Sequence, residues 1–495
     1  MTTVQTAERA PAPTSSLPSP PVGPGAVPGR SAVGVVATIV AGAALWDLAL
    51  RSRAGGTAAF AAVLTLCAGL ARSGWVRRRG GRVLLRAAVV VAGFLVLRSS
   101  PWLVAADLAT IAVLLALACT AESGAGLFRV RFSAVARRLL EAVGALIVGV
   151  GALAATFGAL LPERRGGTVT GSIARGLLLA APIVAVLGVG LATADAVFAS
   201  LVQVELDLTG VVPHLVVLGG ATWVSIGWFV LATRPPVRSA PSTPWIGSVE
   251  ALVVMCGLCA LYAAFAASQL LVARRGPDYV QQATGLTYAD YARSGFFQLL
   301  WVAAATAVVL LVLGTATRPA GRGVDRLLRA TGVLAAASTL VVVHAALVRL
   351  GLYEDAFGAT LLRVAASTTA WWLGAVFVVI GASFLVPSTR PRSWLPTALG
   401  CVTLATVLVV NTVDPEHRVV AHNLERARDG ESFDVSYAMA LSADSVPVLV
   451  EGLQDLDPTE SSAALRELCA RHGAGPTRWN VAERRAARLL DERCG

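Results

Sequence analysis

The segment GLTYADYARSGFFQLLW (residues 285–301) places polar and aromatic side chains directly before an apolar stretch. Tyr288, Asp290, Tyr291 and Arg293 lie close together in this segment. An arginine side chain can hold a phosphate or a carboxylate through two parallel hydrogen bonds. These residues are therefore chemically suited to bind a charged ligand, such as the head group of a lipid-linked substrate.

The same residues also suit the start of a membrane helix. Thr287 and Asp290 have the spacing of a capping box. Tyr288 and Tyr291 share one helical face and fit the aromatic belt at a membrane surface, and Arg293 can pair with Asp290 or with a lipid phosphate. The residues alone leave the ligand interpretation and the structural interpretation open.

Similar polar and aromatic groups recur in three other segments, ADAVF, RLGLYEDAFG and DPEHRVVAHNLER. We expect these segments and the first one to face the same side of a membrane, as the topology below predicts. The hypothesis is one outward-facing polar surface formed by Asp195, Tyr288, Asp290, Tyr291, Arg293, Tyr353, Asp355, Arg363, Asn423 and Arg426.

No catalytic constellation accompanies these candidates. The sequence shows no serine–histidine–aspartate arrangement, and Cys256 and Cys259 lie within an apolar stretch where thiolates are disfavoured. His417 and His422 are five residues apart, which places them on different helical faces. We therefore predict no catalytic residue, metal site or cofactor, and we leave enzymatic activity open.

Composition determines the elements that must position these residues. Of the 495 residues, 56% are hydrophobic and only 14% are charged. Apolar stretches of about 20 residues recur, which is the length that crosses a bilayer as a helix. The predicted fold class is all-α, a polytopic helical membrane protein. Its basic residues outnumber its acidic ones, with a net charge of +11, and this positive charge is expected to contact lipid head groups rather than nucleic acid.

We predict eleven membrane-spanning helices. Their ranges are 31–50, 54–71, 83–97, 101–120, 176–193, 211–231, 249–272, 296–314, 330–348, 366–386 and 396–412. Residues 1–29 are rich in proline and are expected to be a disordered cytoplasmic tail, followed by a bundle over 30–413 and a helical extramembrane region over 414–495.

Segment 139–161 is apolar enough to be a twelfth span, which would reverse the orientation of everything after it. Arginines favour the cytoplasmic side. Without a crossing at 139–161, cytoplasmic segments hold 23 arginines and outer loops hold eight, whereas with a crossing the division is 17 to 14. We therefore expect this segment to pack in the membrane or lie on its inner face, which leaves the N-terminus inside and residues 414–495 outside.

Two further features agree with this orientation. Cys469 and Cys494 are the only cysteines of the C-terminal region, and such a pair could form a disulfide in an oxidising compartment. The ionisable groups inside spans, Asp47, Asp107, His214 and His344, lie toward the outer helix ends. Charged groups in a membrane tend to face a bundle interior, so these four could line an outer cavity. Alternatively, each could extend its polar end to the membrane surface or pair with a neighbour such as Arg98 or Arg349.

At these motifs the chain is similar to a largely bacterial family of polytopic membrane proteins, domain of unknown function 4153, with its 4173 relative. The matching elements are Ala194-Asp195 with Phe198, Gly285 through Leu299, Leu352-Tyr353 through Arg363, and Asp414 through Asn423 and Arg426. Asp290 and Gln298 replace two glutamates of the family pattern, and Phe357 replaces a tyrosine. The resemblance, over about residues 30–455, implies a bacterial cell-membrane location and a shared outer surface, but no reaction.

Three classes of function therefore remain. The first is a non-enzymatic envelope sensor, regulator or assembly partner, which the absence of a catalytic constellation favours. The second is a secondary transporter of a small solute, and the third is a membrane enzyme acting on a lipid-linked substrate. The expected partners are membrane lipids and either another envelope protein or a small solute.

Overall fold

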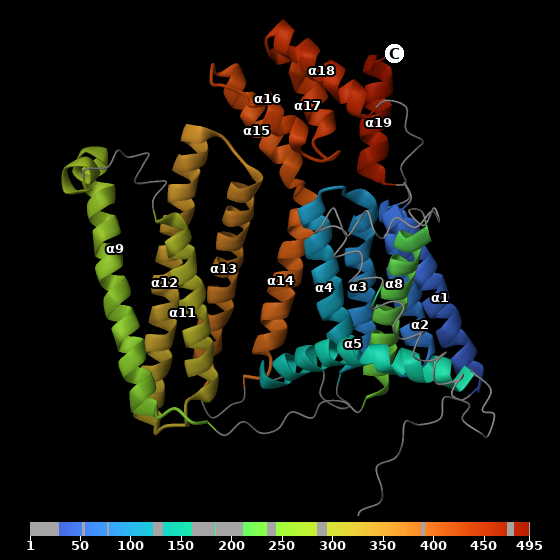
Figure 1. Cartoon of the computed structure of the whole chain (residues 1–495). Helices are drawn as coiled ribbons and strands as arrows, with labels where there is room; N and C mark the ends of the chain where they lie inside the picture. The colour runs from blue at the N-terminus through green and yellow to red at the C-terminus, as the bar shows by residue number, and fades with distance from the viewer. Residues whose placement is uncertain are drawn as a thin grey trace, which may run out of the picture.

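The computed structural model describes residues 29–51, 55–76, 79–121, 132–160, 184, 211–234, 244–284, 295–387, 392–472 and 480–494. Within these ranges the regular elements are helices (Figure 1). Ten of the described helices are long and apolar enough to cross a membrane. The prediction of an all-α, polytopic membrane protein is confirmed.

The ten helices correspond to ten of the eleven predicted spans. They are α1 (Gly29–Arg51), α2 (Gly55–Arg72), α3 (Arg79–Leu97), α4 (Pro101–Cys119), α8 (Val211–Thr233), α9 (Ser248–Thr284), α11 (Phe296–Ala316), α12 (Arg322–Phe357), α13 (Leu361–Leu385) and α14 (Leu395–Val413). The eleventh, 176–193, lies outside the described residues except for Val184. Helices α9 and α12 run several residues past the predicted boundaries, because the polar segments that flank their apolar stretches continue the helix.

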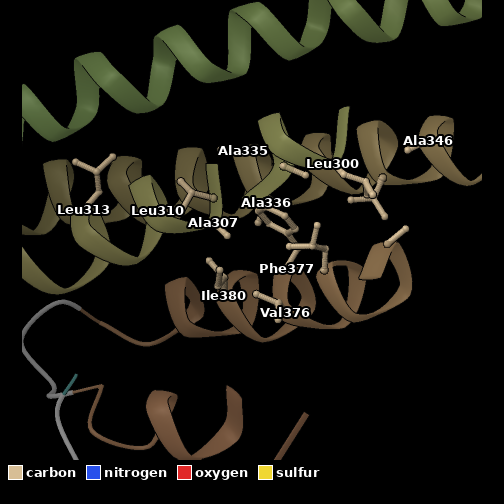
Figure 2. Close-up of a cluster of buried hydrophobic side chains, with 14 of the residues drawn as sticks. Leu300, Ala307, Leu310, Leu313, Ala335, Ala336, Ala346, Val376, Phe377 and Ile380 are labelled. Carbon is tan, nitrogen blue, oxygen red and sulfur yellow. The ribbon is translucent and has the colours of Figure 1, made fainter. Parts of the chain in front are cut away.

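The spans form two groups, each with its own apolar core. One core joins α2, α3, α4, α5 and α8, and the other joins α9, α11, α12 and α13. In the second core, Figure 2 shows Ala307, Ala335 and Ala336 beside Phe377 and Ile380. Such small side chains let helices pack closely, and close packing matters in lipid because the hydrophobic effect does not drive helices together there.

Helix α14 stands between the two groups (Figure 1). Leu399 and Val402 pack against the core of α9 and α11–α13, whereas Leu404, Val407 and Leu408 pack against the core of the other group. This helix therefore couples the two groups and leads directly into the C-terminal helices.

Helix α5 (Phe132–Leu160) contains most of the segment whose crossing was in question. Figure 1 shows it running across the neighbouring helices near one end of the bundle rather than parallel to them. It contacts α8, where the indole Nε1 of Trp223 donates to the carbonyl oxygen of Leu146 at 2.5 Å. This arrangement places α5 at the end opposite to the C-terminal helices, and the interfacial position of 139–161 stays a prediction.

The C-terminal helices are α15 (Pro415–Arg428), α16 (Val435–Ala440), α17 (Val446–Gly452), α18 (Pro458–His472) and α19 (Val481–Cys494), with a short 3-10 turn at Leu453–Asp455. They gather at one end of the bundle, which we call the capped end (Figure 1). They share an apolar core that includes Leu424, Leu449 and Leu468. A disulfide joins Cys469 of α18 to Cys494 of α19, with Cα atoms 5.9 Å apart.

At the opposite end, Arg392 binds the last carbonyl groups of two helices. Its guanidinium donates to the carbonyl oxygen of Ser383 at 2.7 Å, to that of Val386 at 3.3 Å, and to that of Gly314. Helix ends leave such carbonyls without a partner inside the helix. Arg392 therefore ties α11 to α13.

Replacing Arg392 with alanine is expected to lower the free energy of unfolding by about 1.5–3 kcal/mol, since hydrogen bonds from a charged donor to partly buried carbonyls are lost. Thermal unfolding in detergent micelles measures this change. Arg322→Ala, an exposed position at the start of α12, is the matched control. Equal melting temperatures for the two variants would contradict the role given to Arg392.

Candidate functional site

Two polar clusters join the C-terminal helices to the capped end of the bundle. The first, the Arg98 cluster, consists of Arg98, Ser99, Ser100, Asp414, Glu416, Ser442 and Asp444. The second, the Asn423 cluster, consists of Tyr353, Gly358, Ala359, Arg363, Asn423 and Arg426. Each cluster links residues that are far apart in the sequence.

Arg98 follows α3 and binds the junction between α14 and α15. Its Nε donates to the carbonyl oxygen of Asn411 at 2.7 Å. Its Nη1 pairs with the carboxylate of Asp414 and lies 3.5 Å from Oδ1 of Asp444. The side chain of Asp444 is only 1% exposed, so this arginine neutralises a carboxylate that water barely reaches.

Asp414 forms the sharp turn between the last span and α15. It has a positive φ of 57°, which is unusual for a residue other than glycine. Its Oδ1 accepts a hydrogen bond from the backbone N–H of His417 at 3.2 Å, as an N-cap does. Pro415 follows at the first helical position, where its missing N–H costs nothing.

Burial raises the pKa of Asp414 above its ordinary value of 3.8, and the nearby Asp444 carboxylate raises it further, while Arg98 and the N–H of His417 act in the opposite direction. The folded chain therefore binds a proton at Asp414 more readily than the unfolded chain does. As pH rises from the ordinary pKa through the raised folded pKa, the contribution of this group to stability falls.

The carboxylate of Asp444 holds the loop between α3 and α4. Its Oδ2 accepts hydrogen bonds from the backbone N–H groups of Ser99 at 2.8 Å and Ser100 at 2.9 Å. Ser100 also donates its hydroxyl to Glu416, whose second oxygen accepts from the N–H of Ser442 at 2.7 Å. These acidic groups are occupied in joining the helices together.

In the second cluster, Asn423 of α15 binds the turn between α12 and α13. Its Oδ1 accepts from the N–H of Ala359 at 2.7 Å, and its Nδ2 donates to the carbonyl oxygen of the same residue at 2.9 Å. The turn passes through Gly358, whose φ is 77°. A Cβ at that position would lie 2.8 Å from Arg426 Nη1 and 2.9 Å from Asn423 Oδ1, so the close fit requires glycine.

Arginine side chains complete the same turn. Arg363 donates to the carbonyl oxygen of Phe357 at 3.1 Å and to that of Gly358, and it lies over the ring of Tyr353, 4.0 Å from the centroid. Arg426 donates to the carbonyl oxygen of Ala356 at 3.4 Å. These contacts bind backbone carbonyls at the end of α12, which is a structural task.

The structure thus brings together four of the ten residues predicted for the outer polar surface: Tyr353, Arg363, Asn423 and Arg426. Asp355 is exposed near the end of α12. Asp195, Tyr288, Asp290, Tyr291 and Arg293 lie outside the described residues. The described end of that motif approaches α12, since a Cβ on Gly295 would lie 3.1 Å from Arg349 Nη1.

The four ionisable groups predicted inside spans have different surroundings. His214 Nδ1 lies 2.7 Å from Asp47 Oδ2, which joins α8 to α1. Asp107 is fully buried on α4 and accepts a hydrogen bond from Asn411 Nδ2 of α14 at 2.8 Å. His344 is exposed on α12. The His214–Asp47 and Asp107–Asn411 contacts each join two helices. Pairing with a neighbour was the alternative to an outer cavity in the sequence analysis.

Sequence reasoning did not identify Asp444, Glu416, Ser99 and Ser100 as site residues. The available signal was the short polar connection RSSP between two apolar stretches, together with the polar turn SADS in the C-terminal region. Nothing in their spacing indicates that the two segments meet. Among the described residues, no group of three or more histidine, cysteine or acidic side chains could hold a metal ion.

The arrangement as a whole can fix the C-terminal helices to the membrane helices, because its charges are paired with each other across that junction. The family model described as domain of unknown function DUF4153 matches residues 84–452, well over half of the chain. No curated protein and no solved structure matches. Both polar clusters lie within the matched residues, and the chain belongs to the DUF4153 family.

Proposed function

We propose that this membrane protein is a non-enzymatic component of the bacterial cell envelope. In this proposal the spans hold the C-terminal helices as a fixed binding surface on the extracytoplasmic side. One observation carries the proposal. The described polar residues of the family motifs, Asn423, Arg426 and Arg363, bind backbone groups of the chain itself.

The disulfide between Cys469 and Cys494 supports the extracytoplasmic orientation, because disulfides persist in oxidising compartments. The five free cysteines all lie in membrane helices.

The net charge of the C-terminal helices indicates the kind of partner. Residues 414–495 carry fifteen acidic residues and ten arginines, and exposed acids include Asp429 and Glu451. We therefore propose a partner with a basic surface, which the negative charge of these helices would attract and orient.

A cysteine introduced at the exposed Ala463 of α18 tests orientation and partner together. We expect a membrane-impermeant maleimide carrying a photo-cross-linker to label Ala463→Cys in intact cells. Illumination is then expected to yield one discrete adduct with another protein. Adding Glu451→Arg is expected to reduce the adduct several-fold at unchanged thermal stability, since the exposed charge is reversed.

Two controls accompany this experiment. Arg322→Cys, at the opposite end of the bundle, is expected to react only after the cells are permeabilised. The unmodified chain measures background labelling of its free cysteines. Labelling of Arg322→Cys alone in intact cells would overturn the orientation, and labelling of Ala463→Cys without any protein adduct would overturn the proposed partner.

A further inference from the structure

A cavity of about 420 Å³ lies between the capped ends of α1–α4 and the start of α19. Its volume falls in the range of small-molecule sites, roughly 300–1,000 Å³. The wall on the membrane side is apolar and includes Trp46, Leu50, Leu95, Val104 and Leu108. These residues belong to spans, so the apolar part of the cavity lies within the membrane bundle.

The rim on the side of the C-terminal helices is polar. Ser99 and Arg98 come from the α3–α4 connection, and Asn480 and Glu483 come from the start of α19. Asn480 is nearly buried and donates to the carbonyl oxygens of Leu95 at 3.2 Å and Arg98 at 2.7 Å. The rim is therefore held rigidly against the membrane helices by a contact between residues that are far apart in the sequence.

The two walls together select an amphipathic occupant. Water fills a cavity well only where polar groups surround it, and the lower wall offers apolar side chains instead. A free polar solute meets the same obstacle. A lipid places its acyl chain beside apolar side chains and its head group beside polar ones, and the bilayer supplies lipid at the depth of this cavity.

We infer that this cavity binds one acyl chain and the adjoining head-group region of one phospholipid from the leaflet at the capped end, while the rest of that lipid stays in the bilayer. The acyl chain lies against Trp46, Val104 and Leu108, and the head group lies at the rim formed by Ser99, Asn480 and Glu483. The bound lipid bridges the spans and α19. This inference does not depend on the proposed protein partner, because it concerns the junction inside the chain.

Native mass spectrometry tests the inference on the full chain, released from nanodiscs of phosphatidylethanolamine and phosphatidylglycerol. We expect one phospholipid to remain bound at collision energies that remove the surrounding lipid. Val104→Trp fills the cavity and is expected to reduce the occupied fraction at least five-fold. Val113→Trp, an exposed position on the same helix, is expected to keep the wild-type occupancy.

A second measurement does not depend on the variants. Adding either phospholipid to delipidated wild-type protein in detergent is expected to raise its melting temperature, whereas glycerophosphoethanolamine, which has no acyl chain, is expected to leave it unchanged. An equal rise with the headgroup analogue would show a polar solute site instead. The inference fails if no lipid remains bound to the wild type, if Val104→Trp keeps it, or if added phospholipid has no effect.

Discussion

Replacing Arg98 with alanine is expected to lower the free energy of unfolding by about 3–5 kcal/mol, the usual cost of removing one partner from a buried ion pair. The substitution leaves the carboxylates of Asp414 and Asp444 close together, with side-chain exposures of only 19% and 1%. It also removes the hydrogen bond to the carbonyl oxygen of Asn411. The junction between α3, α14 and the C-terminal helices loses both ion pairs that Arg98 makes there.

Thermal unfolding in detergent measures the loss, and limited proteolysis shows where it occurs. We expect the C-terminal helices to become protease-sensitive before the membrane helices do. The matched control is Arg428→Ala, which removes an exposed ion pair with Asp455 in the same helices. Exposed pairs contribute about 0–1 kcal/mol, so a similar loss in both variants would contradict the role of Arg98.

The stability of the Arg98→Ala variant is expected to depend on pH, because the carboxylates of Asp414 and Asp444 lose their cation. Without the arginine, the pKa of Asp414 rises further above its ordinary value, because Arg98 is one of the groups that lower it. A group with a raised folded pKa stabilises the fold when protonated, and it loses that contribution as pH rises. The defect is therefore expected to be smaller at mildly acidic pH than at neutral pH.

A second substitution separates charge from shape. Asp444→Asn keeps an oxygen that can accept from the N–H groups of Ser99 and Ser100 and removes the charge. The double variant with Arg98→Ala is expected to regain part of the lost stability. A double variant less stable than Arg98→Ala alone would show that the repulsion between carboxylates is not the cause.

The fold class could be predicted from the sequence because membrane helices carry a strong local signal. An apolar stretch of sufficient length must satisfy its backbone groups internally, so it forms a helix wherever it lies. The predicted range 101–120 and the observed α4, Pro101–Cys119, show how closely such boundaries can be placed. The exact ends of α9 and α12 were missed because polar residues beyond a span continue a helix equally well.

The junction could not be predicted, because it depends on tertiary contacts between residues hundreds of positions apart. Asp444 lies in an ordinary polar turn, and only the folded chain shows that it holds Ser99 and Ser100. The motif residues Asn423 and Arg426, which the sequence assigned to one surface with Tyr353 and Arg363, lie in one cluster with these two residues in the structure. Their contacts with backbone atoms of the α12–α13 turn favour a structural role for Asn423 and Arg426.

Asn423→Ala is expected to lower the free energy of unfolding by about 2–6 kcal/mol, since it leaves two backbone groups without partners at about 1–3 kcal/mol each. Both groups belong to Ala359, which is 7% exposed and follows the left-handed Gly358. Water reaches this turn poorly, so it cannot replace the amide. The variant is expected to show a lower melting temperature and reduced abundance in the membrane.

Asn423→Asp provides a sharper comparison, because it keeps the oxygen that accepts from the Ala359 N–H and replaces the donor to the Ala359 carbonyl with a second acceptor, whose charge the nearby Arg426 partly offsets. Its stability is expected to lie between those of the wild type and Asn423→Ala. Glu425→Ala, exposed on the same helix, is the control that is expected to change little. A polar ligand site would behave differently: Asn423→Ala would then melt like the wild type while the function of the protein was lost. That result would support a ligand-binding role for Asn423 and Arg426 in place of the structural role.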